Sequence, residues 1–359
     1  MTPAPVPAPA TGPDAGAVWH YGDPLGEQRT AADGVVVVDR SHRAVLTLTG
    51  ADRRSWLHTI SSQHVSELPD GAVTENLNLD GQGRVEDHWF QTQLDGVTVL
   101  DTEASRVEPL RAYLTKMVFR ADVKVEVSDL KVLTLLGPAA AEVVPAVLGI
   151  TPPAPWSATP LSGGGFVRTL GAGEVDVVTP AANAEDIRQR LVAAGARPAG
   201  VWAYEAHRVV ALQPRLGLDT DDRTIPHEVG WIGGPGEGAV HLNKGCYRGQ
   251  ETVARVHNVG KPPRMLALLH LDGSADRPAT GDPVLSDGKP VGRLGTVVDH
   301  VDFGPIALAL LKRGLPADTP LLTGGESAVA AVIDADTLPP ADVVGAGRIA
   351  IQQLRNVRR

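Results

Sequence analysis

The sequence predicts an α+β protein whose last third is a small antiparallel β-barrel. Up to about residue 258, strand-like apolar runs alternate with segments of helical periodicity. From about residue 265, only short apolar runs remain, separated by turn pairs such as Asp272-Gly273 and Asp287-Gly288, which is typical of a small barrel. A chain of 359 residues with 43% hydrophobic residues suits two or three domains with substantial cores.

The first elements predicted along the chain are two strands and a helix. Residues 1 to about 16 are rich in Pro and Ala and are expected to be disordered or extended, so we predict a flexible tail over 1–34. Apolar runs at 35–39 and 44–50 predict strands. Asp52 then lies where an N-cap belongs, and Trp56, Leu57 and Ile60 share one face of the helix behind it.

A hairpin is predicted over 76–90, with Asp80-Gly81 as its turn pair. In a regular return strand Asp87 shares a face with Val85 and Trp89, whereas Glu86 points to the other face. An acid on a buried face is costly unless a ligand or a donor satisfies it. This argument favours Asp87 over Glu86 as a binding residue, and the alternative is an acid that only solvates the hairpin.

The rest of the mixed region continues the alternation of strands and helices. Residues 105–119 place apolar side chains on one helical face, and Val123, Val125 and Val127 alternate with charged residues as in a half-buried strand. Further strands are predicted at 132–136 and 175–178, and further helices at 184–194 and 201–212.

The stretch 244–251 contains the only cysteine of the chain, Cys246. Lys244 and Arg248 flank it at two residues' distance, and a thiol beside fixed positive charge loses its proton more easily. Glycines bracket the stretch and it shows no helical or strand periodicity, so we predict a loop with an exposed, reactive thiol. The alternative is a buried, inert cysteine.

Charge and composition restrict the classes of ligand and compartment. The net charge of −9 argues against broad nucleic-acid binding. Residues 244–264, however, carry five cations and one acid, which favours an anionic ligand there over an ordinary solvated loop. A single cysteine excludes an internal disulfide, the N-terminus lacks a secretory pattern, and no run reaches the ~20 apolar residues of a membrane span. We therefore expect a cytoplasmic protein without membrane or nucleic-acid partners.

The octapeptide at 244–251 resembles the K-G-C-Y-x-G-Q-E signature of the YgfZ-like branch of the folate-binding aminomethyltransferase (glycine-cleavage T-protein) superfamily. The resemblance continues into 225–228 and 252–255 and covers about 35–345. It implies a two-module folate-binding α/β region at 35–258 with a break near 130–140. A C-terminal β-barrel domain at 259–345 and a tail at 346–359 would follow.

The resemblance also implies tetrahydrofolate, with or without a polyglutamate tail, as the cofactor. Val210 stands where T-proteins have the Glu that contacts the pterin ring, so Glu205 or Glu228 is a candidate replacement. Asp80 and Glu86 compete with Asp87 for the place of the acid that contacts the folate amines. The predicted cofactor-binding residues are Asp87, Arg208, Glu228, Tyr247, Gln250, Glu251 and Arg255, and the predicted catalytic residues are Cys246, Lys244 and Arg248; no metal ligands are predicted.

The function that the resemblance implies is folate binding coupled to the assembly or repair of iron–sulfur clusters. One cysteine cannot hold a cluster that normally needs four thiolates, so Cys246 would act with iron–sulfur or cluster-assembly proteins as partners. An alternative is a folate-dependent aminomethyltransferase or demethylase that passes a one-carbon unit to tetrahydrofolate. A third is a folate-binding regulator without chemistry.

Overall fold

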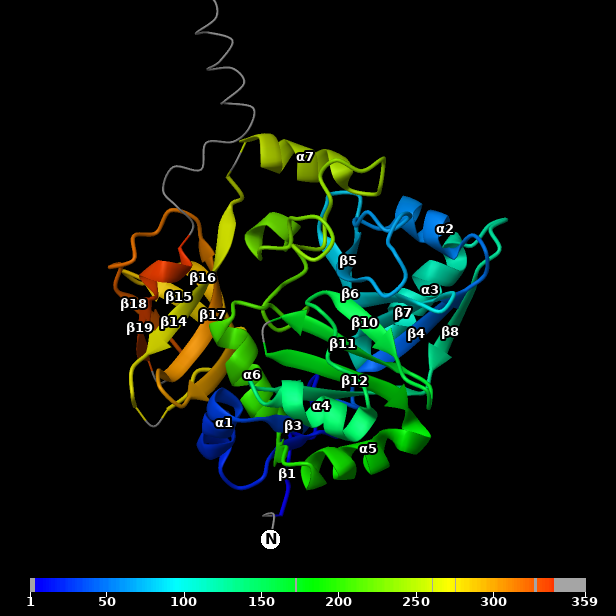
Figure 1. Cartoon of the computed structure of the whole chain (residues 1–359). Coiled ribbons are helices and arrows are strands. Elements are labelled where there is room, and N and C mark those ends of the chain that lie inside the picture. Colours follow the sequence, from blue (N-terminus) through cyan, green and yellow to red (C-terminus); the bar gives the residue numbers. More distant parts are fainter. Residues whose placement is uncertain (1–3, 172, 260, 275, 326–327, 339–359) are drawn as a thin grey trace, which may run out of the picture.

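The computed structural model describes residues 4–171, 173–259, 261–274, 276–325 and 328–338. Figure 1 shows a five-stranded sheet with helices on one side, a six-stranded sheet with helices below it, and a β-barrel at the opposite side of the molecule. The predicted α+β architecture with a terminal barrel is confirmed. Among the described residues, no helix has the length and apolar character needed to cross a membrane.

The first sheet has the strand order β5-β6-β7-β4-β8. Its strands are β4 (Ala44–Thr49), β5 (Val73–Leu79), β6 (Val85–Leu94), β7 (Val97–Thr102) and β8 (Lys124–Ser128). Helices α2 (Arg53–Ile60) and α3 (Val107–Met117) pack on it, and a short 3₁₀ helix, η1 (Ala104–Arg106), precedes α3. Trp56, Leu57, Leu110 and Leu114 from these helices meet Trp89 of β6 in one core, as the helical spacing predicts.

The second sheet has the order β10-β11-β12-β9-β3-β13. Its strands are β3 (Val36–Asp39), β9 (Leu130–Leu136), β10 (Ser157–Pro160), β11 (Phe166–Gly171), β12 (Glu174–Pro180) and β13 (Arg197–Ala199). Helices α4 (Ala140–Leu148) and α5 (Ala181–Ala193) cover one face, and α6 (Val201–Val210) lies between this sheet and the barrel (Figure 1). The chain passes from the first sheet to the second between Ser128, the end of β8, and Leu130, the start of β9. Strand β3 belongs to the second sheet although it precedes the first sheet in the sequence.

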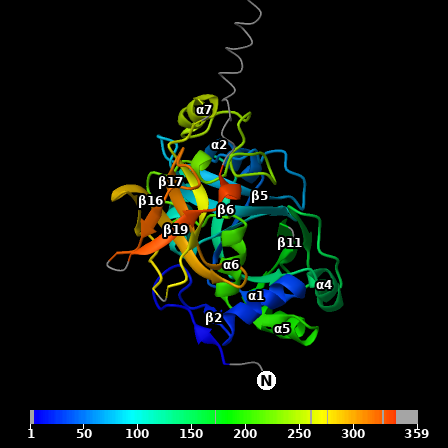
Figure 2. The same ribbon diagram turned by 90° about the vertical axis from the view of Figure 1, so that its left-hand side faces the viewer.

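The N-terminal stretch 1–34 was predicted as a flexible tail, and for its described part this is wrong. It forms β1 (Val6–Pro7), β2 (Val18–His20) and α1 (Pro24–Asp33), seen at the lower edge of Figure 2. Asp23 caps α1 by accepting a hydrogen bond from the Gly26 amide, and Pro24 occupies the first turn, where proline is well tolerated. The prediction relied on the Pro- and Ala-rich composition of this stretch and therefore missed the helix and its cap.

The barrel closes in the order β14-β17-β16-β15-β18-β19. Its strands are β14 (Arg264–Leu271), β15 (Pro283–Ser286), β16 (Lys289–His300), β17 (Gly304–Lys312), β18 (Leu321–Thr323) and β19 (Val329–Ile333). Alternate residues point inward and form its core, as in small closed barrels. A 3₁₀ helix, η3 (Ala335–Thr337), follows, and the predicted tail at 346–359 lies outside the described residues.

Between α6 and the barrel the chain forms long loops, η2 (Pro226–Glu228) and α7 (Gln250–Val259). Helix α7 lies apart from the body at the top of Figure 1. Of its described side chains only Val253 is buried, so α7 has little core to hold it in place.

Candidate functional site

A cavity of about 230 Å³ lies where the two sheets meet α6 and the loop that follows it. Strands β5 and β6 provide one part of the wall, β11 and β12 another, and α6 with residues 212–215 a third. Its lining contains Arg40, Arg43, Glu75, His88, Phe90, Glu103, Trp156, Glu174, Tyr204, Arg208, Arg215 and Trp231. The cavity therefore depends on segments that are far apart in the sequence.

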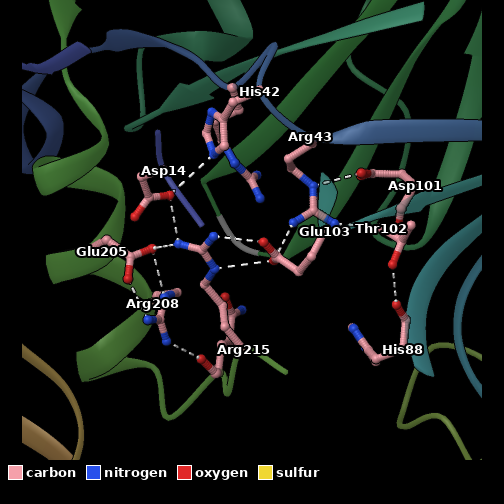
Figure 3. Close-up of polar contacts among 12 residues, drawn as sticks. Asp14, His42, Arg43, His88, Asp101, Thr102, Glu103, Glu205, Arg208 and Arg215 are labelled. Carbon is pink, nitrogen blue, oxygen red and sulfur yellow. Dashed lines mark hydrogen bonds and ion pairs between the residues drawn. The ribbon is translucent and has the colours of Figure 1, made fainter. Parts of the chain in front are cut away.

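A buried ion network forms one side of this cavity (Figure 3). At its centre Arg215 donates to Glu103 at 2.8 Å, to Glu205 at 2.7 Å and to Asp14 at 2.9 Å. Glu103 also accepts a hydrogen bond from Arg43 at 2.8 Å. Burial alone would raise the pKa of Glu103, but Arg215 and Arg43 hold it well below its usual range. Each of these acids thus accepts a hydrogen bond from at least one arginine, whose planar guanidinium group matches the geometry of a carboxylate.

Arg208 extends the network toward the barrel. It pairs with Glu205, one helical turn away, and donates to Asp219 at 2.7 Å. Its guanidinium also contacts the Thr296 hydroxyl of β16. Arg208 thus links α6 to the loop after it and to the barrel, and its donors are occupied.

Another part of the wall is aromatic. His88 stacks on Trp231 with ring centroids 4.7 Å apart and an interplanar angle of 9°, and its Nε2 lies 2.9 Å from Glu75. The guanidinium of Arg40 lies over the Tyr204 ring, 3.7 Å from its centroid. Flat faces of this kind stack on a planar ligand.

Asp87, predicted to bind folate, does not belong to the lining of this cavity. Arg106 binds its carboxylate at 2.7 Å and Asn78 donates to it at 3.0 Å. The predicted facing is wrong for Val85, because a β-bulge sets both Glu86 and Asp87 opposite Asn78. Val85 therefore packs with Leu77 and Trp231 rather than with Trp89.

Of the other predicted cofactor contacts, only Arg208 lines the cavity. Glu228 is buried, but Arg264 and the Ile225 amide hold it. Tyr247 packs in a core cluster, and burial raises its pKa to about 12. Gln250 donates to the Lys244 carbonyl at 3.4 Å, while Glu251 and Arg255 are exposed on α7.

Cys246 is exposed, as predicted. Its two flanking cations have partners of their own: Lys244 donates to the carbonyls of His58, Ser61 and Gln63, and Arg248 pairs with Glu86 at 2.9 Å. Burial lowers the pKa of Lys244 to about 8. Lys244 is therefore an anchor that ties the cysteine loop to the first module. The predicted loop ends at Gly249, since α7 begins at Gln250.

The basic character of 244–264 is weaker than the sequence indicates. Besides Lys244 and Arg248, Arg264 is neutralised by Asp221 at 3.0 Å and by Glu228 at 2.8 Å. Arg255 and Lys261 are the exposed cations of this stretch for which the described residues offer no ion-pair partner.

The sequence reasoning missed most of the cavity lining, including Glu75, Glu103, Glu174 and Arg215. These residues belong to no local motif and converge only in the folded chain. One signal was available: in Glu174-Val175-Asp176-Val177-Val178, acids alternate with valines inside a strand. Acids at inward positions of a strand need partners or a ligand.

Comparison with known proteins gives a consistent picture, although no family model matches the chain. A chloroplastic protein of Arabidopsis thaliana named as a transferase is 27% identical over 307 residues, 82% of this chain and 69% of that protein. The tRNA-modifying protein YgfZ of Vibrio vulnificus is 26% identical over 294 residues, 79% of this chain and 86% of that protein. An aminomethyltransferase of Herpetosiphon aurantiacus is 26% identical over 315 residues, 82% and 83% of the two chains.

Among solved structures, the glycine cleavage system aminomethyltransferase T of Bartonella henselae superposes with a TM-score of 0.80 at 17% identity, covering 90% of this chain and 92% of that one. That likeness shows the same fold over nearly the whole length. The sequence matches, which include YgfZ proteins from two species, agree with it. In sequence the chain is therefore similar to YgfZ proteins and aminomethyltransferases, and it has the fold of the aminomethyltransferase (glycine-cleavage T-protein) structure.

Proposed function

We propose that the central cavity binds a reduced folate, tetrahydrofolate, by its pterin head. The observation that carries this proposal is a cavity with flat walls between the modules of an aminomethyltransferase fold. Its volume of about 230 Å³ is below the ~300–1,000 Å³ of pockets that enclose a whole drug-sized ligand. The cavity therefore suits a bicyclic ring, with the benzoylglutamate part leading outward.

The walls supply both kinds of contact that such a ring needs. Trp156, Phe90 and the stacked pair of His88 and Trp231 offer apolar faces. Arg40, held against Tyr204, adds a planar cation. A glutamate tail would find few free cations, since Arg255 and Lys261 remain of the five in 244–264. We therefore expect polyglutamylation and salt to change affinity only modestly.

Tetrahydrofolate titrated into the pure protein should quench tryptophan fluorescence in a saturable way, because Trp156 and Trp231 line the cavity. A Trp231→Phe variant should lose much of the optical signal while calorimetry still detects binding. Trp19 and Trp202 lie together elsewhere, so a Trp19→Phe variant is the matched control and should keep the quench. Absence of both heat and quench in the wild type would exclude this proposal.

We further propose that Cys246 serves iron–sulfur cluster assembly or repair on a partner protein. Support comes from its exposure on a loop anchored by Lys244, and from its absence from the cavity lining. A single thiolate supplies one ligand, so the remaining ligands must come from the partner. The alternative of one-carbon transfer uses a carboxylate rather than a thiol, and the acid predicted for that place, Asp87, lies outside the cavity lining and is bound by Arg106.

Replacing Cys246 by Ser should leave tetrahydrofolate affinity unchanged and abolish the support that the chain gives to four-iron enzymes. The readout is the activity of a cluster-dependent dehydratase in cells that lack the chain and are complemented with wild type or variant. Full complementation by Cys246→Ser would remove the thiol from the function and favour a folate-binding regulator.

A further inference from the structure

Strand β8 forms an open edge of the first sheet. Among the described residues it pairs only with β4, and the order β5-β6-β7-β4-β8 leaves its other side without a strand. Figure 1 shows β8 on the side of the molecule opposite the barrel. An open edge presents N–H and C=O groups that can pair with the backbone of another chain. The side chains at this edge therefore decide whether it is a contact surface.

Exposed apolar side chains gather around β8. Met117 at the end of α3 is 40% exposed, Phe119 in the connection from α3 to β8 is 84% exposed, and Val127 on the strand is 52% exposed. Val127 lies on the same face of the strand as Val125, which packs against the core of the first sheet. Large apolar side chains exposed together in this way indicate a surface that a partner covers.

The charged side chains of β8 lie on its other face. Lys124 and Glu126 alternate with the valines, and their side chains form an ion pair at 2.8 Å while 68% and 49% exposed. An exposed pair of this kind contributes about 0–1 kcal/mol, so little is lost when each group takes the same partner from another chain. Charges on an edge strand discourage unselective pairing, and their order along β8 therefore restricts which strand can bind.

We propose that β8 pairs in antiparallel fashion with β8 of a second copy of this chain, around a twofold axis at Val125. Residues directly opposite each other in an antiparallel pair lie on the same face of the joined sheet. In this register Lys124 of each copy faces Glu126 of the other, and Val123 faces Val127. The contact thus contains two pairs of opposite charge on one face and only valines on the other.

Charge disfavours the neighbouring registers. Centring the pair on Glu126 sets two glutamates opposite each other, and centring it on Lys124 does the same with two lysines. Like charges directly opposite destabilise a strand pair, so the register at Val125 is the complementary one. A contact of this kind uses the same patch on both copies and closes at a dimer. The lining of the central cavity contains no residue of β8, so this dimer is independent of the proposed folate binding.

The test is sedimentation equilibrium of the full chain over a wide range of concentration, where the wild type should approach the mass of two chains. Lys124→Glu and Glu126→Lys each place like charges opposite each other, so each should weaken the dimer about tenfold or more, which corresponds to ~1.4 kcal/mol. A mixture of these two variants should form heterodimers, because an acidic edge then faces a basic one. The double variant, with both charges exchanged, should dimerise as the wild type does.

Asp186→Lys is the matched control, since Asp186 is 71% exposed and pairs with Arg190 on α5, beside the second sheet; it should leave the dimer unchanged. Phe119→Ser should weaken the dimer, and thermal melts should show that every variant is folded. A wild type that keeps the mass of one chain at every concentration overturns the proposal. A dimer that Glu126→Lys leaves intact also overturns it, because the copies then meet elsewhere, and so does a mixture of the single variants that stays monomeric.

Discussion

Replacing Arg208 by Ala should lower the free energy of unfolding by about 3–5 kcal/mol, since breaking a buried ion pair leaves a buried charge uncompensated. Arg208 is 1% exposed and forms ion pairs with Glu205 and Asp219, which are both buried. Asp219 in turn accepts from the Thr296 amide at 2.7 Å. This approach needs Gly295, because a Cβ there would lie 2.3 Å from the Asp219 carboxylate.

A matched control exists in the chain. Arg188 and Glu185 also form a pair three residues apart on a helix, but their side chains are 23% and 62% exposed. Exposed pairs contribute about 0–1 kcal/mol, so Arg188→Ala should change urea denaturation little. Arg208→Lys keeps the positive charge but lacks the planar guanidinium group. Its loss of stability should therefore lie between those of Arg208→Ala and Arg188→Ala. Equal losses of stability in Arg208→Ala and Arg188→Ala would show that burial does not determine how much these ion pairs stabilise the fold.

How much of this fold the sequence predicts depends on whether the signal is local. The apolar runs of β3, β9 and β12 and the spaced apolar residues of α3 appear where predicted. The barrel follows from regular turns between short strands. These features follow from side-chain periodicity within a few residues of the chain.

Contacts between residues that lie far apart in the sequence were not predicted. Asp14 lies in a Pro- and Ala-rich stretch that predicts disorder, yet Arg215 and His42 bind it. One bulge beside Asn78 changed which face Val85 occupies. Lys244 and Arg248 flank Cys246 in sequence, but each is bound to groups about 160–190 residues away, and nothing in the local sequence indicates those partners.

The predicted contacts and the cavity lining differ for the same reason. Most of the predicted contacts lie in or beside the motif at 244–251, whereas the cavity is lined by residues from many separate segments of the chain. Arg208 is the one predicted contact that the fold places there, through its helix rather than through the motif. Arg40 has no neighbour in sequence that indicates a ligand, and for Glu174 the one such signal is the alternation of acids with valines at 174–178.

Glu174→Gln should stabilise the ligand-free protein, and the gain should grow with pH. Burial and the Asp176 charge raise the pKa of Glu174 to about 7. Below pH 4.5 the acid is protonated in the folded and the unfolded chain, so it adds no pH-dependent term. Between pH 4.5 and about 7 the unfolded chain loses the proton that the folded chain keeps, so wild-type stability falls as pH rises. Above pH 7 the full difference remains, on the order of 3 kcal/mol, and Gln avoids it.

The measurement is urea denaturation of both proteins at pH 4.5, 6 and 8 without ligand. Other acids, such as Asp101 and Glu103, have lowered pKa values, and the stability they add is lost as pH falls. They are present in both proteins, so their contribution cancels in the difference. A difference that stays constant with pH would show that Glu174 is not held protonated by its surroundings. A gain at pH 8 would show that this buried carboxylate is retained at a cost in stability.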